Sequence, residues 1–183
     1  KRVLMIGTDM AAGKMTVGLE LYSYLRDKNI KTGFVATGQV GITVTGKGIP
    51  LDAYKLDHAC GAVEAAVIEQ KEKDIVIVEG QGSILHPGSS ATLPLMRGTC
   101  PTHMILCHIA RNDSLRSLEN IKIPDLKKFI TLNEELSSVL GTYSNSKVIG
   151  IALNTVEMSD NEAKEFIKKT EEETGLPVSD VIR

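Results

Sequence analysis

The sequence has no tryptophan, few aromatic residues and no large excess of one charge. Aromatic residues make up 4% of its 183 residues, and its formal net charge at pH 7 is −2. Proteins that bind single-stranded nucleic acid stack bases on aromatic side chains, and nucleic acids and anionic membranes both attract strongly basic surfaces. Because the sequence has neither feature, we expect no nucleic-acid partner and no membrane partner.

Cysteine is scarce, and no segment is typical of export or membrane insertion. The three cysteines, Cys60, Cys100 and Cys107, are an odd number without a CxxC pair, which suits a reducing compartment. There is no signal peptide and no apolar run near the length of a membrane span. These absences favour a cytoplasmic location.

Natural start and stop signals are also missing. The chain begins with Lys1 and Arg2 rather than an initiator methionine, and only residues 3–6 separate them from Gly7. A composition of 42% hydrophobic and 24% charged residues is that of one ordinary globular domain. We therefore expect residues 1–183 to be a single domain of a longer protein, whose missing neighbour holds part of the function.

Short apolar runs alternate with longer stretches of helical periodicity. The apolar runs are continuous, as in strands buried on both faces, and they cover residues 3–6, 32–36, 74–78, 104–107 and 147–153. Helical spacing predicts helices over residues 14–28, 57–73, 125–141 and 159–174. This alternation predicts an α/β fold, a mostly parallel sheet with helices on both faces in a three-layer sandwich of the P-loop NTPase type. Two glycine-rich stretches, residues 37–50 and 79–99, are expected to be irregular and to carry function.

The segment MIGTDMAAGKMTVGLEL (residues 5–21) almost matches the phosphate-binding pattern G-x-x-x-x-G-K-[ST]. Five residues rather than four separate Gly7 from Gly13, but the order strand, loop and helix is the one that a phosphate loop needs. Backbone N–H groups at the helix start and the Lys14 ammonium would bind phosphate oxygens. The alternative is a helix start that matches the pattern by chance.

The residue after Lys14 changes the chemistry that this loop supports. In the usual loop a hydroxyl at that position binds Mg²⁺, whereas here it is Met15 and the hydroxyl of Thr16 follows one residue later. Thr16 therefore points about 100° further round the helix. The sequence predicts phosphate binding, and it does not favour metal-assisted transfer of a γ-phosphoryl group.

Polar residues also follow the third predicted strand, in IVIVEGQGSILHP. Glu79 is placed where a nucleotide-binding protein has a carboxylate near Mg²⁺ or a reacting group, and Gln81 offers hydrogen-bond donors and an acceptor. His86 could be a general base or a substrate donor. The alternatives are a glutamate that caps a turn and a histidine on an exposed loop.

The loop after the second predicted strand offers further candidates. Gln39 has an amide suited to a pocket wall, and the carboxylates of Asp52 and Asp57 could hold a metal or orient an amine. Acids at the start of a helix that complement its dipole are an equally good explanation of the two aspartates.

Cys100, His103, Cys107 and His108 suggest a zinc site, but their spacing argues against it. Cysteine pairs of zinc sites usually have two to four residues between them, a spacing that Cys100 and Cys107 do not have. In a strand, His108 would also face away from His103 and Cys107. His108 is still of interest, because it ends a strand at the presumed active edge.

Three residues near the last two strand ends complete the candidates. Arg111 and Arg116 could grip a phosphate or a carboxylate, or they could be solvated surface residues. Asn154 ends the fifth predicted strand, where it could contact a base, although asparagine is also common in turns.

Taken together, these motifs resemble two families. GTDMAAGKMT, VEGQG and GIALN are similar to segments of dethiobiotin-synthetase-like P-loop proteins. A closer resemblance, over nearly the whole chain, is to the D-glutamate N-acetyltransferase family, long catalogued as a domain of unknown function. It is carried by ATGQVG, EGQGSILHP, CHIAR and GIALNT. Members of that family also have an N-terminal Rossmann-like domain, which this chain lacks.

The second resemblance implies acetyl transfer from acetyl-CoA to the amine of D-glutamate. A phosphate loop could then clamp the diphosphate of CoA without the Mg²⁺ ligand that Met15 replaces. Cofactor contacts are expected from Gly7, Thr8, Asp9, Gly13, Lys14, Met15, Thr16 and Asn154. Catalytic candidates are Glu79, His86 and His108, and substrate contacts are expected from Gln39, Asp52, Asp57, Gln81 and Arg111.

Two other functions remain open. An ATP-dependent ligase or kinase resembling dethiobiotin synthetase would use Thr16 and Glu79 to bind Mg²⁺, and a non-catalytic module would only bind nucleotide. The expected ligands are therefore acetyl-CoA or ATP, with Mg²⁺ possible, and a small amino acid. We also expect a homo-oligomer, because P-loop relatives often dimerise across the active edge.

Overall fold

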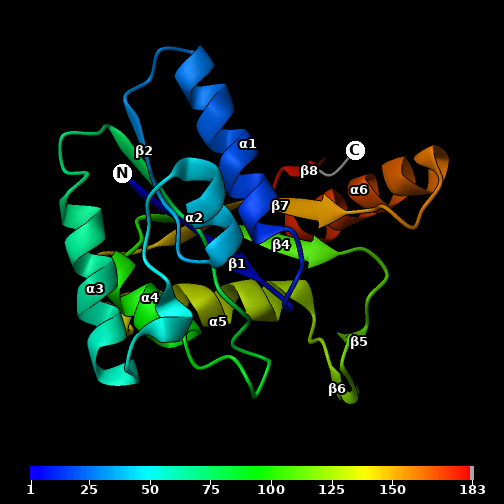
Figure 1. The fold of residues 1–183 in the computed structure, drawn as a ribbon. Helices are drawn as coiled ribbons and strands as arrows, with labels where there is room; N and C mark the ends of the chain where they lie inside the picture. Colours follow the sequence, from blue (N-terminus) through cyan, green and yellow to red (C-terminus); the bar gives the residue numbers. More distant parts are fainter. Residues whose placement is uncertain (182–183) are drawn as a thin grey trace.

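The computed structural model describes residues 1–181 as one α/β unit built on a six-stranded parallel sheet (Figure 1). In sheet order, the strands are β2 (Thr32–Val35), β3 (Ile75–Val78), β1 (Arg2–Gly7), β4 (His103–Ile109), β7 (Lys147–Asn154) and β8 (Val178–Asp180). The five strands predicted from apolar runs are all present. All neighbouring pairs are parallel, so the carboxyl ends of the strands share one edge.

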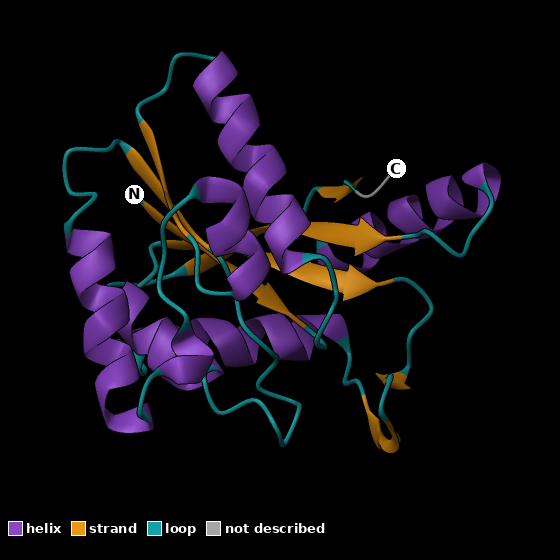
Figure 2. Ribbon diagram, viewed as in Figure 1, coloured by secondary structure: helices purple, strands orange, loops and turns teal. Residues whose placement is uncertain are grey.

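Helices cover both faces of the sheet, which confirms the predicted three-layer arrangement (Figure 2). The core on one face includes side chains from α3 (Leu56–Ile68), α4 (Thr92–Thr99), α5 (Leu126–Ser138) and α6 (Asp160–Thr174). The core on the other face includes side chains from α1 (Lys14–Asp27) and α2 (Gln39–Thr45).

The two stretches predicted to be irregular each contain a helix, so that prediction was wrong. Residues 37–50 contain α2, whose sequence QVGITVT is rich in β-branched residues and glycine and therefore has low helix propensity. Residues 79–99 contain α4, with Pro94 in its first turn, where proline is tolerated. A Cβ on Gly98 would overlap the Cys60 carbonyl oxygen, so α4 lies directly on α3. Contacts with the rest of the fold outweigh local propensity in both helices.

Three short strands were not predicted. β8 extends the sheet beyond β7, while β5 (Ser114–Leu115) and β6 (Leu118–Lys122) form a separate antiparallel hairpin. Such short segments carry too little periodicity to be recognised. The predicted helices are also shorter than expected, because α3 ends at Ile68 and α5 at Ser138.

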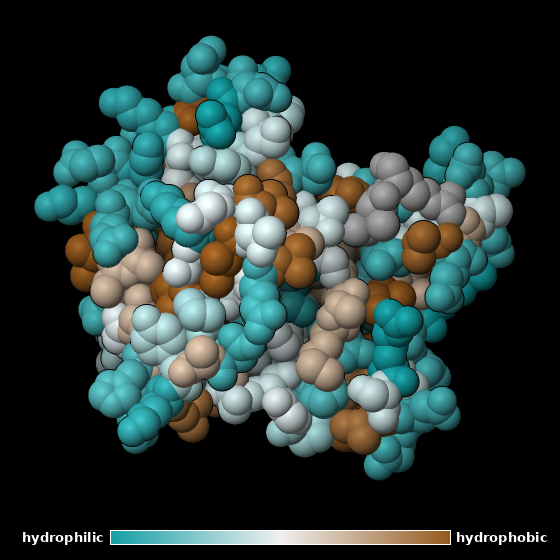
Figure 3. Space-filling model, in the orientation of Figure 1, coloured by the Kyte–Doolittle hydropathy of each residue, from teal (hydrophilic) through white to brown (hydrophobic). Residues whose placement is uncertain are grey.

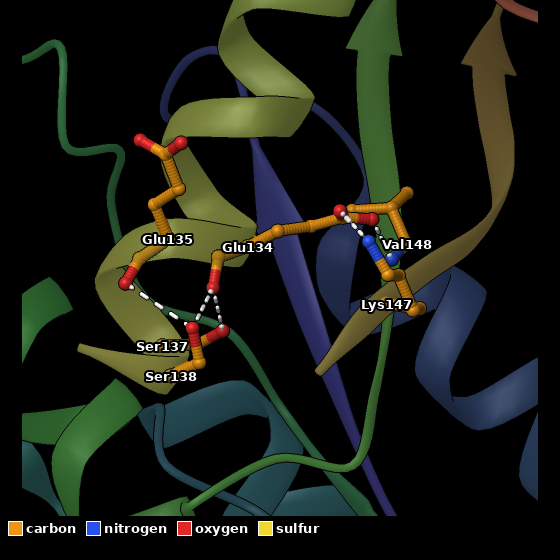
Figure 4. A network of polar contacts seen from close by, with 6 residues as sticks. All are labelled: Glu134, Glu135, Ser137, Ser138, Lys147 and Val148. Atoms are coloured by element: carbon orange, nitrogen blue, oxygen red, sulfur yellow. Dashed lines mark hydrogen bonds and ion pairs between the residues drawn. The ribbon is translucent and has the colours of Figure 1, made fainter. Parts of the chain in front are cut away.

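Glu134 of α5 ties that helix to the start of β7 (Figure 4). Its carboxylate accepts hydrogen bonds from the Val148 N–H at 2.9 Å and from Lys147 Nζ at 2.6 Å. The hydroxyls of Ser137 and Ser138 both donate to the Glu134 carbonyl oxygen. The register between β4 and β7 shifts just beyond Val148, so Glu134 supports the strand at an irregular point of the ladder.

α2 is short and poorly buried. Among its residues only Gly41 is buried, while Val40 and Val44 expose 59% and 63% of their surface. Figure 3 shows hydrophobic side chains exposed on the face that α2 occupies. The position of α2 therefore depends on specific contacts at its N-terminus more than on packing.

No helix within residues 1–181 is both long enough and apolar enough to cross a membrane.

Candidate functional site

The loop between β1 and α1 has the geometry of an anion-binding turn. Gly13, which precedes the helix, has a φ of 101° that favours glycine. α1 begins at Lys14, so the N–H groups of its first turn have no partner within the helix and present positive charge. A Cβ on Gly7 would lie 2.9 Å from Lys14 Nζ, so the lysine side chain folds back over the loop.

Lys14 is almost completely buried. It is 7% exposed, and its Nζ donates to the Asp9 carbonyl oxygen at 2.8 Å. Burial lowers the pKa of Lys14 from its ordinary value. The ammonium is thus held by the loop itself, at the place where a phosphate would be its stronger partner.

Asp9, one of the predicted cofactor contacts, fastens the β5–β6 hairpin to the loop. The residue is 1% exposed, and its two carboxylate oxygens accept from the Met10 N–H at 2.7 Å and the Arg116 N–H at 2.9 Å. Arg116 therefore contacts the loop through its backbone, while the residue itself is exposed.

Thr8 and His108 form a support beneath the loop. The Thr8 hydroxyl lies 2.9 Å from His108 Nδ1, and the Thr8 carbonyl oxygen accepts from the Ser83 hydroxyl at 2.9 Å. Burial lowers the pKa of His108 to about 4, so its ring is neutral at neutral pH. The structure therefore places His108 under the loop rather than in an open cavity.

A cavity of about 360 Å³, here called the loop cavity, lies between this loop and the residues after β3. Its walls include the helix start predicted to bind phosphate and the polar residues predicted after the third strand. They are Met10, Ala11, Gly13, Lys14, Met15, Thr16, Glu79, Gly80, Gln81 and Gly82. Two motifs that are more than 60 residues apart in the sequence thus meet in one site.

Glu79 has a second task beside lining the loop cavity. It is 4% exposed, and its Oε2 accepts from the Thr37 N–H at 2.9 Å and the Gly38 N–H at 3.2 Å. A Cβ on Gly41 would overlap this oxygen. Glu79 therefore caps the entry to α2, as one of the two explanations from the sequence had it, and fixes that helix against the cavity.

A second cavity of about 260 Å³, here called the side cavity, adjoins the first. Both cavities have Met10, Gln81 and Gly82 in their walls. The remaining walls of the side cavity come from residues 51–59 and from the loop before α4, namely Leu51, Asp52, Tyr54, Leu56, Ala59, Gly88, Ser89, Ser90 and Ala91. Of these the sequence indicated only Asp52, because the others belong to no motif.

The side chains of Gln39 and Asp52 are hydrogen-bonded to each other at the side cavity, which Asp52 lines. Gln39 Nε2 donates to Asp52 Oδ2 at 3.0 Å, and both residues are exposed. Asp57, the other predicted carboxylate, lies exposed in the first turn of α3 and is in the wall of neither cavity.

Two other predicted residues lie elsewhere in the molecule. Arg111 forms an ion pair with Glu162 at 2.9 Å, away from both cavities. The hydrogen bonds of Ser159, with those of Arg111, hold the pKa of Glu162 at about 2. Asn154 ends β7 at the carboxyl edge of the sheet, where its Oδ1 accepts from the Val156 N–H at 3.1 Å.

His86 lies near the β5–β6 hairpin and in the wall of neither cavity. Its Nδ1 accepts from the Gly88 N–H at 3.0 Å, and its Nε2 is 3.4 Å from the Ser117 hydroxyl. The histidine thus orders the loop that forms one wall of the side cavity.

Cys107, one residue of the zinc hypothesis, is fully buried, and burial raises its pKa to about 12. Zinc binds the thiolate rather than the thiol, so this environment disfavours metal binding. Within residues 1–181 no three His, Cys, Asp or Glu side chains are grouped so that they could hold a metal ion.

Comparison with known proteins places these features in one family. A family model described as "Domain of unknown function (DUF1611_C) P-loop domain" matches residues 1–183. The crystal structure of a DUF1611 family protein from Anabaena variabilis is 46% identical, with a TM-score of 0.97 over 100% of this chain and 54% of its own. A D-glutamate N-acetyltransferase from Tritonibacter scottomollicae is 34% identical over 100% of this chain and 55% of its own length.

The chain therefore spans about half the length of these relatives. More distantly, a nucleotide-binding protein from Archaeoglobus fulgidus in complex with ADP has a TM-score of 0.54 at 14% identity, over 97% of this chain and 79% of its own. That likeness shows the P-loop fold alone.

Proposed function

Because the chain belongs to the DUF1611 family as its P-loop domain, we propose that its loop cavity binds the diphosphate of acetyl-CoA. In this proposal the domain is part of an N-acetyltransferase that acts on the amine of a small amino acid such as D-glutamate. The observation that carries it is the loop cavity itself, in which an open helix N-terminus and a buried lysine face a polar wall. The name of the 34% identical relative supports the reaction.

The proposed reaction needs no phosphoryl chemistry. The lone pair of the amine attacks the carbonyl carbon of the thioester, a C–N bond forms, the C–S bond breaks, and the proton of the amine leaves with the CoA thiol. Binding a diphosphate and splitting one are different tasks, and only the second requires the metal-binding hydroxyl after the lysine. Met15 in that position is therefore compatible with CoA as the ligand.

The residues that would hold the diphosphate are those of the helix start. The N–H groups after Gly13 would donate to its oxygens, and Lys14 would exchange the Asp9 carbonyl for a phosphate oxygen. Glycine at position 80 keeps the opposite wall close, since a Cβ there would meet Lys14 Cδ at 2.9 Å.

One observation supports a second function. Thr16 and Glu79 are both in the wall of the loop cavity, and a hydroxyl with a carboxylate is a donor set that Mg²⁺ accepts. An ATP-dependent ligase or kinase would use this pair.

Calorimetry with acetyl-CoA, ADP and ATP–Mg²⁺ separates the two functions. We expect acetyl-CoA and ADP to bind without Mg²⁺, because the site holds phosphates through N–H groups and a lysine. ATP binding that requires Mg²⁺, without any acetyl-CoA binding, would overturn the proposal and favour the second function. An acetylation assay with D- and L-glutamate then tests the reaction. ATP turnover without acetyl transfer would favour the ATP-dependent ligase or kinase over the acetyltransferase.

A further inference from the structure

We propose that the side cavity is the acceptor site of this enzyme and that Asp52 is the general base that takes the proton of the acceptor amine. This inference rests on the proposed function, because it assigns the second substrate to a place beside the CoA site. It also names a base that differs from the three catalytic candidates of the sequence.

The two cavities are arranged for two parts of one reaction. They have Met10, Gln81 and Gly82 in common as wall residues, so the side cavity is the neighbouring space for the other end of a ligand whose diphosphate lies in the loop cavity. Gly82 adopts a φ of 60°, and a Cβ there would overlap the Ser89 side chain. The common wall is thus thin at this point because the residue is glycine.

The lining of the side cavity offers an amino acid an apolar surface, hydroxyl donors for its carboxylates and one carboxylate for its amine. Leu51, Leu56, Ala59 and Ala91 give apolar surface, while Tyr54, Ser89 and Ser90 offer hydroxyl groups. Asp52 is the one ionisable carboxylate among the wall residues, and none of those described wall residues is basic. A carboxylate without a competing cation attracts an ammonium group, and it takes a proton from the nitrogen after that group has lost its first proton to solvent.

Asp52 is held in place by a defined partner. Gln39 Nε2 donates to its Oδ2 at 3.0 Å, and no hydrogen bond to Oδ1 is found among the described residues. Gln39 is the first residue of α2, and the Gly38 N–H just before it is bonded to Glu79. The base is therefore positioned by the same helix start that Glu79 anchors at the loop cavity.

The earlier candidates for the base are engaged elsewhere. Glu79 accepts two backbone hydrogen bonds and lines the loop cavity, where the diphosphate would lie. His108 is buried against Thr8, and His86 has contacts at both ring nitrogens. None of the three is in the wall of the side cavity.

The proton balance of the step is simple. An acceptor ammonium gives one proton to solvent on forming the reactive amine, whose nitrogen attacks the thioester carbonyl carbon. As the C–N bond forms and the C–S bond breaks, the second proton passes from nitrogen to the Asp52 carboxylate. Asp52 then delivers it to the CoA thiolate, so the products are the N-acetyl amino acid and the CoA thiol.

The test is Asp52→Asn in the full chain, with Asp57→Asn as the matched control. Loss of a general base lowers kcat/KM by about 100-fold or more, whereas Asp57→Asn, five residues away and outside both cavities, is expected to leave it unchanged. Calorimetric affinity for CoA should stay the same in both variants.

Gln39→Ala adds a graded measurement. Because this variant removes the positioning partner of Asp52, its kcat should be several-fold lower, with little change in its CoA affinity. Full transfer activity in Asp52→Asn would overturn the inference. So would a loss of CoA affinity in that variant as large as its loss of kcat/KM.

Failure of the proposed function gives a different pattern. If the wild-type chain binds CoA but transfers no acetyl group, an NMR titration with D-glutamate tests the acceptor site independently of the reaction. Weaker binding in Asp52→Asn than in Asp57→Asn supports that site, and equal binding refutes it.

Discussion

The loop cavity and the side cavity adjoin each other but are built in different ways. The loop cavity combines the open helix start after Gly13 with Gly80 and Gly82 after β3, so that backbone contributes to its walls. The side cavity is formed by side chains from residues 51–59 and 88–91, which belong to no regular motif. A site made from backbone geometry leaves a pattern in the sequence, and a site made from scattered side chains does not.

This comparison predicts that the two cavities differ in their tolerance to substitution. A change in the loop cavity should affect folding or the binding of any phosphate ligand, because backbone groups are part of the proposed receptor. A change in the side cavity should affect only the second substrate.

The largest effect is expected for Gly80→Ala. A Cβ on Gly80 would overlap the Met5 carbonyl oxygen, which belongs to the central strand and cannot move aside. We expect a loss of about 3 kcal/mol in the free energy of unfolding, measured by urea denaturation.

Gly61→Ala is the control for Gly80→Ala. Gly61 lies within α3, and a Cβ there would meet no atom within 4 Å. Alanine in that helix should increase stability by about 0.5–1 kcal/mol. Equal stability of the two variants would show that the wall of the loop cavity is not as tight as described.

Lowering the pH is expected to reduce the free energy of unfolding by a similar amount, because of the buried ring of His108. Burial lowers the pKa of His108 from 6.5 to about 4. Between these values the unfolded chain binds a proton that the folded protein does not, so stability falls as the pH decreases from 6.5 to 4. The loss should approach about 3 kcal/mol at pH 4, and denaturation of the wild type and of His108→Gln across this range measures it. A wild-type profile parallel to that of His108→Gln would contradict the buried neutral ring.

Lys14→Ala should abolish phosphate-ligand binding with a smaller effect on folding. Two charge-assisted hydrogen bonds to a diphosphate correspond to about 100-fold in affinity or more. Calorimetry with ADP and with acetyl-CoA should show the same loss for both, because they have the diphosphate in common. An unchanged affinity would refute the assignment of the loop cavity.

Much of the fold could be predicted because its signals are local. Continuous apolar runs identified β1, β2, β3, β4 and β7, and helical spacing identified α1, α3, α5 and α6. Ser159 and Glu162 form the capping box at the start of α6. α2 and α4 were missed because their sequences contain several poor helix formers, and only contacts with distant segments make them helical.

The candidate site divides in the same manner. Gly13, Lys14, Thr16, Glu79 and Gln81 were predicted, and the structure brings them to one cavity. Arg111 and Asp57 were also predicted, because a charged residue at this edge of the sheet is a reasonable candidate, but neither is in the wall of either cavity. Only the tertiary structure shows in which direction an exposed side chain on a turn or a first helical turn points.

The sequence by itself determined the parallel sheet, the loop between β1 and α1, and the absence of a hydroxyl directly after Lys14. These depend on residues that are neighbours in the chain, whose steric and hydrogen-bonding preferences act locally. The tertiary structure decided that Glu79 anchors α2, that His108 supports Thr8 from below, and that Gln39 positions Asp52 beside the loop cavity. Each of these pairs joins segments at least 13 residues apart, and such contacts form only when the complete sheet brings its loops to one edge.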